Sequence, residues 1–111
     1  MPSLTEIVRP TLDDPAVCVV RGEVDISNVA ELRAGLAAAF AESPAVVVDL
    51  ADVAFMASAG VRALVEAGTR PGRRMAIVVG PGVATILRIC GMARIVPCAT
   101  DRAAAERACR G

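Results

Sequence analysis

The chain has 111 residues, with 12 basic and 12 acidic side chains, so its formal net charge is zero, and it contains no histidine. This length suits one compact domain with its own core. Without histidine the chain cannot build a Ser-His-Asp or Cys-His catalytic site, and the commonest ligand of catalytic zinc is missing. The balanced charge and the lack of Tyr and Trp argue against nucleic-acid binding.

Membrane insertion is also unexpected. No apolar stretch is long enough to cross a bilayer, and the N-terminus lacks the basic-then-apolar order of a signal peptide. We therefore expect a cytoplasmic protein with no direct membrane insertion and with no cofactor or metal. Only two of the many hydrophobic residues are aromatic, so the core is expected to be aliphatic.

The first elements are predicted to form a hairpin. Residues 4–8 suit a short edge strand, Asp13-Asp14-Pro15 suits a turn, and residues 16–21 form a second strand rich in valine. Residues 22–28 then link this strand to a helix.

The spacing of Asn28 and Glu31 predicts a capping box at the start of that helix, with Ser27 as a competing cap. Ser43-Pro44 ends the helix. One helical face is apolar and carries Val29, Leu32, Leu36 and Phe40.

A strand, a short connection and a second helix follow. Residues 45–48 are apolar and β-branched, as expected for a strand buried on both faces, and Asp49 is predicted to end it. The small residues 57–60 then open a helix, with Ser58 as its N-cap and Gly68 as a left-handed C-cap. The free N–H groups at such a helix start suit an anion or an acidic partner, although a turn without a ligand is the simpler alternative.

The remaining elements repeat this alternation. Residues 75–80 form an apolar strand, 81–82 open a third helix that ends at a Gly91 cap, and 94–98 form a last strand. Thr100 or Asp101 then caps a helix over 102–109. This order predicts an α/β fold with a mostly parallel mixed sheet, an N-terminal hairpin and about four helices.

Three segments in order resemble the STAS family, the sulfate-transporter and anti-sigma-factor-antagonist domain. Gly22-Glu23-Val24-Asp25, before a capped helix, is similar to the family's G-E-L-D. Residues 48–60 resemble a signature with Asp-Leu, then Val-x-Phe, then Ile or Met, Asp, two residues that are each Ser or Thr, and Gly. Residues 90–97 are similar to L-x-G-L-x-x-x-F/V. The chain is identified as a single STAS domain over residues 1–111.

The resemblance implies a non-enzymatic anti-sigma factor antagonist. Such a protein binds an anti-sigma factor, which is often also a kinase, and so frees a sigma factor. The kinase phosphorylates the Ser or Thr before the signature glycine, which ends the interaction. By resemblance, the partner-binding surface comprises Asp25, Ser27, Asn28, Ala57, Ser58, Ala59, Gly60 and Arg62. We also expect Met56, Ala57 and Ala59 to form a small exposed apolar patch.

The chain departs from the family at the phosphoacceptor, where Ala59 has no hydroxyl, and at the signature Asp, which is Ala57. Ser58 keeps a hydroxyl, but consecutive helical residues point about 100° apart. We therefore expect an antagonist that lacks the usual switch, with phosphorylation of Ser58 as the alternative.

The cysteines are the other switchable groups in the sequence. Cys18, Cys90, Cys98 and Cys109 show no C-x-x-C spacing, and the simplest interpretation is four reduced thiols. Redox-tuned binding through Cys90, Cys98 and Cys109 is the alternative hypothesis.

Three further possibilities are left open. The chain could be the STAS subunit of another complex, such as a lipid-transport ATP-binding cassette assembly. It could self-associate as a weak homodimer. A receiver-type phosphoacceptor at Asp49, with Asp25 and Asp52 as metal ligands, is disfavoured because the chain has no lysine to complete such a site.

Overall fold

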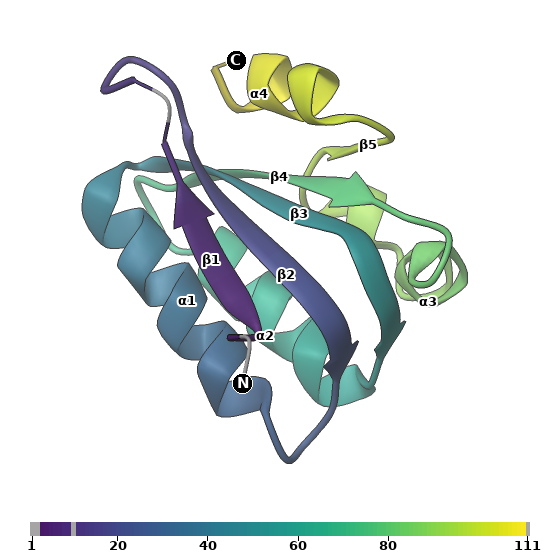
Figure 1. Cartoon of the computed structure of the whole chain (residues 1–111). Coiled ribbons are helices and arrows are strands. Elements are labelled where there is room, and N and C mark those ends of the chain that lie inside the picture. The colour runs from purple at the N-terminus through teal and green to yellow at the C-terminus, as the bar shows by residue number, and fades with distance from the viewer. Residues whose placement is uncertain (1–2, 10, 111) are drawn as a thin grey trace.

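The computed structural model describes residues 3–9 and 11–110, which form one five-stranded sheet in the order β1-β2-β3-β4-β5 (Figure 1). β1 runs antiparallel to β2, and the other neighbours are parallel. The strands are β1 Thr5–Val8, β2 Ala16–Val24, β3 Ala45–Met56, β4 Arg74–Val79 and β5 Cys98–Ala99. The helices are α1 Val29–Glu42, α2 Ser58–Gly68, α3 Ala84–Ile89, the 3₁₀ turn η1 Met92–Arg94, and α4 Arg102–Arg110. The predicted α/β class, hairpin and helices are confirmed.

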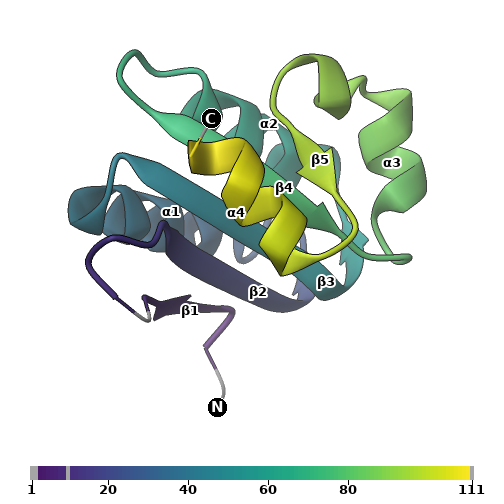
Figure 2. The same cartoon turned by 90° about the horizontal axis from the view of Figure 1, so that it is seen from above.

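The sheet is covered on both faces, with α1 and α2 on one side and α4 on the other (Figure 2). Alternate residues of β3 point into different cores, because side chains on a strand alternate between its faces. Val46 and Val48 pack in the larger core with α1 and α2, whereas Val47 packs in the smaller core under α4. None of the described helices is long and apolar enough to cross a membrane.

Both central strands are longer than their sequence patterns predict. β3 does not end at Asp49 but continues to Met56, and β2 continues past Arg21 to Val24. Asp49 is tolerated inside the strand because its carboxylate is satisfied: Oδ1 accepts from Ala51 N at 2.9 Å and Oδ2 accepts from Arg102. These extensions carry the chain to the edge where the candidate site lies.

The predicted ends of two helices have different outcomes. Gly91 has a φ of +70° and provides the predicted left-handed turn. Gly68 does not, because it is the last residue of α2 and lacks a positive φ. It instead allows a close approach, since a Cβ there would lie 2.7 Å from Met75 Cε.

The C-terminal part was predicted only partly correctly. The expected strand over 94–98 is wrong: η1 occupies the start of that stretch and β5 contains only Cys98 and Ala99. Of the two candidate caps for α4, Asp101 is confirmed, because its Oδ1 accepts from Ala104 N at 2.8 Å.

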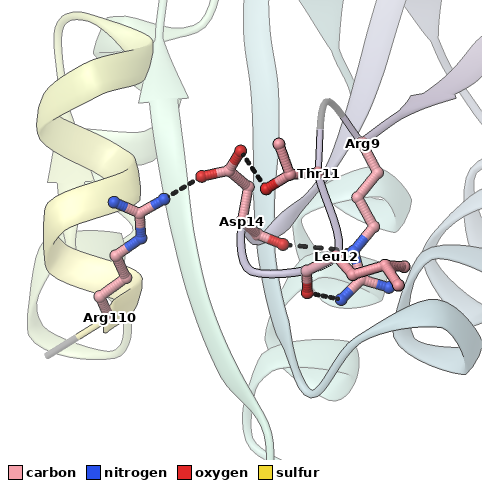
Figure 3. A network of polar contacts seen from close by, with 5 residues as sticks. All are labelled: Arg9, Thr11, Leu12, Asp14 and Arg110. Atoms are coloured by element: carbon pink, nitrogen blue, oxygen red, sulfur yellow. Dashed lines mark hydrogen bonds and ion pairs between the residues drawn. The ribbon is translucent and has the colours of Figure 1, made fainter.

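Polar contacts tie the β1–β2 turn to the C-terminal helix (Figure 3). Asp14 accepts from Arg110 of α4 and from Thr11 Oγ1, the latter at 2.9 Å. Arg9 donates to the carbonyls of Leu12 and Asp14 at 2.8 and 3.2 Å. The turn is thereby held close to the end of α4.

Candidate functional site

The carboxyl ends of β2 and β3 bring two distant segments together. Val24 is in register with Met56, and Ala57 N donates to the Val24 carbonyl at 2.8 Å. Because the strands are parallel, the loop of residues 25–28 and the start of α2 leave the sheet at the same edge. The two segments that the sequence selected therefore lie side by side.

Side chains of the 25–28 loop hold its shape. Asn28 accepts from Asp25 N at 2.9 Å through Oδ1 and donates through Nδ2 to the Glu23 carbonyl at 2.8 Å. The capping-box prediction is therefore wrong: the Asn28 side chain points back to the loop, and among the described residues no side chain caps α1.

Asp25 is the second organiser of this loop. Its Oδ1 accepts from both the backbone N–H, at 2.8 Å, and the hydroxyl of Ser27. These bonds favour the charged carboxylate, so the pKa of Asp25 lies below its ordinary value. The loop thus presents Ile26 between two residues that are fixed to each other.

The start of α2 is built from small residues. Ala57, not Ser58, is the N-cap residue, so the predicted capping role of Ser58 is wrong; Ser58 is the exposed first residue of the helix. Ala59 is half-buried. Gly60 is buried, and a Cβ on it would lie 2.7 Å from Met56 Cγ and 2.9 Å from Val24 Cγ1. Gly60 therefore lets the helix sit on the strand ends and adds little surface of its own.

A groove of about 360 Å³ lies between the loop and the two helices. It brings together three predicted residues and three that sequence reasoning missed: Ser58, Ala59 and Arg62 with Ile26, Val29 and Arg33. Asp25, Ser27 and Asn28 lie in the adjacent loop and are not part of its lining.

Ile26 is the main apolar feature of this surface, with 80% of the residue exposed. The expectation that Met56 would be exposed is wrong, because Met56 is only 2% exposed and packs in the core. The signal that could have identified Ile26 is an aliphatic residue between Asp25 and Ser27 in a polar loop.

The groove is also cationic. Arg33 forms an ion pair with Glu66 at 2.5 Å, whereas exposed Arg62 forms no ion pair with any other described residue. An exposed isoleucine beside a free guanidinium suits a partner surface that is apolar at its centre and acidic at its rim.

Asp49 was considered as a phosphoacceptor with nearby metal ligands. Residues 3–9 and 11–110 hold no group of three or more side chains that could bind a metal ion, and Asp49 forms an ion pair with Arg102 of α4.

All four cysteines are free thiols. Burial raises the pKa of Cys18 to about 11 and also raises the pKa of Cys98 and Cys109, which disfavours their reactive thiolates. Redox control stays a prediction, with Cys90 as the exposed thiol.

The fold is that of a small α/β domain with a mixed sheet covered on both faces. A family model described as "Mlab, STAS domain" matches residues 9–97, and the chain belongs to the STAS domain family. The matched residues include the whole groove and stop before α4.

Solved structures share the fold across most of the chain. An anti-sigma factor antagonist from Mycobacterium paratuberculosis is 26% identical, with a TM-score of 0.78 over 100% of this chain and 98% of that chain. A proposed antagonist from Thermotoga maritima is 19% identical, with a TM-score of 0.71 over 96% and 93%. The antagonist SpoIIAA in its unphosphorylated form is 17% identical, with a TM-score of 0.62 over 88% of each chain. No curated protein matches the chain by sequence.

Proposed function

We propose that this protein is a non-enzymatic anti-sigma factor antagonist, which binds a kinase-like anti-sigma factor and thereby frees a sigma factor. The observation that carries the proposal is the groove that joins Ile26 to Ser58, Ala59 and Arg62. Its support from the comparisons is the 26% identical antagonist, which matches the full length of the chain.

Ile26 supplies the apolar part of this interaction. Burying an exposed isoleucine side chain against a partner contributes about 1.5–3 kcal/mol. Arg62 supplies charge specificity, because a carboxylate of the partner can form a bidentate pair with its guanidinium. Such a small apolar centre with a charged rim suits a transient interface.

The antagonist is further proposed to escape phosphorylation at the family position. Ala59 occupies the second residue of α2, half-buried in the groove, and has no hydroxyl to accept a phosphoryl group. A phosphate there would add about −1.5 to −2 charges to the docking surface. Without it, an ATP-dependent kinase cannot use this residue to end the interaction.

The direct test is displacement of a sigma factor from its complex with an anti-sigma factor of the same genome. The wild-type protein is expected to release the sigma factor, both with and without ATP. Ala59→Ser is expected to release it equally well without ATP and to lose activity with ATP, as it becomes phosphorylated. Ala93→Ser, at an exposed alanine outside the groove, is the matched control.

Two results would contradict this proposal. Failure of the wild type to release any sigma factor would remove the antagonist function. Stoichiometric phosphorylation of the wild type at Ser58, with loss of binding, would show that the switch persists at the neighbouring residue.

The second candidate function is that of a STAS subunit in another assembly, such as a lipid-transport ATP-binding cassette complex. The observation that favours it is the matching family model, whose description names Mlab and not an antagonist. Co-purification from the native host decides between the two: a stoichiometric ATP-binding cassette protein supports this candidate, whereas an anti-sigma factor supports the first.

A further inference from the structure

A second groove, of about 390 Å³, lies at the β4–β5 side of the sheet, where α3 and η1 meet these two strands. Figure 2 shows α3 beside these two strands. The groove shares no lining residue with the one at Ile26. Its apolar lining includes Val79, Ala84, Leu87 and Ala93.

One wall of this groove is a single face of α3. Ala84, Leu87 and Arg88 are spaced i, i+3 and i+4, so their side chains lie on the same side of the helix. Leu87 is 2% exposed and supplies the floor, and Arg88 is exposed. Arg94, from η1, places a second guanidinium at the same groove.

The stretch of sequence that supplies the groove carries charge of one sign, and two of its arginines, Arg88 and Arg94, line the groove. Residues 67–100 contain five arginines, at 70, 73, 74, 88 and 94, and no Asp or Glu. Neither Arg88 nor Arg94 forms a side-chain hydrogen bond or ion pair with another residue in the described part of the chain. The apolar groove is therefore lined by two arginines whose positive charges are not paired with an acidic side chain in the described part of the chain.

We propose that this groove binds a fatty carboxylate as a single free chain. The hydrocarbon tail lies along the apolar lining from Leu87 to Ala93, and the carboxylate pairs with Arg88 and Arg94. Arginine suits this role because its planar fork of donors matches a carboxylate. The volume of about 390 Å³ falls within the range of roughly 300–1,000 Å³ typical of small-molecule sites.

The first test is titration of the ¹⁵N-labelled protein with dodecanoate below its micelle concentration. Saturable binding of one chain is expected, with shifts centred on Gly91, Ala93 and Cys98, which line the groove. Affinity should rise about twofold to fourfold for each CH₂ added from octanoate to dodecanoate. Dodecyltrimethylammonium, which has an equal chain and the opposite charge, should not bind there.

A second readout uses the chain's own thiols. Cys98 lines the groove, whereas exposed Cys90 does not. Bound dodecanoate should slow alkylation of Cys98 and leave the alkylation rate of Cys90 unchanged.

Variants test the charge requirement. Arg88→Gln combined with Arg94→Gln should weaken dodecanoate binding about tenfold. Arg107→Gln, an exposed arginine of α4 outside the groove, should change it less than about twofold. Melting temperatures of the variants confirm that they remain folded.

The proposal is overturned by any of three results: equal binding of the cationic amphiphile, an equal loss of affinity in Arg107→Gln, or shifts that centre elsewhere on the protein. Binding only to vesicles of phosphatidylglycerol, with none to free dodecanoate, would also overturn it in favour of a membrane surface. None of these outcomes depends on whether the Ile26 groove binds an anti-sigma factor.

Discussion

Arg102, at the start of α4, forms an ion pair with Asp49 in the middle of β3. Its Nη2 and Nε lie 2.9 and 3.2 Å from the same carboxylate oxygen, Oδ2. The Asp49 side chain is 12% exposed, whereas that of Arg102 is 43% exposed. The pair therefore anchors the C-terminal helix to a nearly buried charge 53 residues away in sequence.

Removal of this anchor should lower the stability of the whole domain. Arg102→Ala is expected to reduce the free energy of unfolding by about 1–2 kcal/mol, because Asp49 keeps its bond to Ala51 N but loses its cation. Urea denaturation measures the change. Arg107→Ala, on the same helix, should stay within about 0.5 kcal/mol of wild type, and an equal effect of both substitutions would show that the pair does not stabilise the fold.

Two glycines should resist replacement for different reasons. A Cβ on Gly60 would press on Met56 Cγ at 2.7 Å, but that side chain can shift. A Cβ on Gly80 would press on the Ala51 backbone, including its Cα at 2.7 Å, which cannot shift locally. Gly60→Ala should cost about 1–3 kcal/mol, and Gly80→Ala should cost more.

The sign of the Gly60 result is informative. Alanine is the better helix former by about 1 kcal/mol in a helix interior. If Gly60→Ala raised the thermal midpoint, the close approach of α2 to the strand ends would be wrong.

The Asp25 carboxyl should titrate below its ordinary pKa of 3.8, mainly because the Ser27 hydroxyl donates to it. Since the folded-state pKa is lowered, the stabilising contribution of the charged carboxylate is present above the unfolded-state pKa. It is lost as the pH falls through the folded-state value. Ser27→Ala should move the pKa upward, as measured by carboxyl ¹³C shifts against pH; an unchanged pKa would contradict the hydrogen-bond assignment.

The four thiols should react in an order set by exposure and pKa. Cys90 is exposed and should be alkylated first, with Cys98 more slowly, because burial raises its pKa. Cys18 and Cys109 are buried and should react at least about 100-fold more slowly than Cys90. Mass spectrometry of partly alkylated protein gives the order.

The same samples test the redox hypothesis. Four thiols that persist under oxidising conditions, with unchanged partner binding, would end it. A disulfide that formed between two of Cys90, Cys98 and Cys109 and altered binding would support it.

The alternation of strands and helices could be predicted from the sequence because each element carries its own periodicity. The strand over 45–48 is apolar on both faces, and the α1 stripe at Leu32 and Leu36 is spaced for a helix; both patterns are local. The length of β3 could not be predicted. An Asp after an apolar run indicates the end of a buried strand, and Asp49 lies inside β3 because a distant arginine pairs with its carboxylate. That arginine, Arg102, lies on another element and has no local signature.

At the candidate site too, local patterns could be predicted from the sequence and contacts between distant segments could not. The small residues 57–60 after a strand predicted a tight entry into a helix, and the resemblance to the STAS signature assigned these residues to the site. The role of Asn28 was missed, because its side chain could cap α1 or fasten the loop, and both options satisfy its hydrogen bonds. Ile26 was missed because an aliphatic residue between Asp25 and Ser27 could equally have turned into the core, and its 80% exposure depends on how the loop lies against α2.

The central claim is that the groove at Ile26 is the docking surface for an anti-sigma factor. The most direct measurement compares the affinities of Ile26→Asp and Ile89→Asp for that partner by calorimetry. Ile89 is the matched control for Ile26: the two isoleucines are 74% and 80% exposed, but Ile89 lies in α3, outside the groove. We predict that Ile26→Asp raises the Kd at least about 30-fold and that Ile89→Asp changes it less than about twofold. Wild-type affinity in Ile26→Asp, or an equal loss in Ile89→Asp, would contradict the claim.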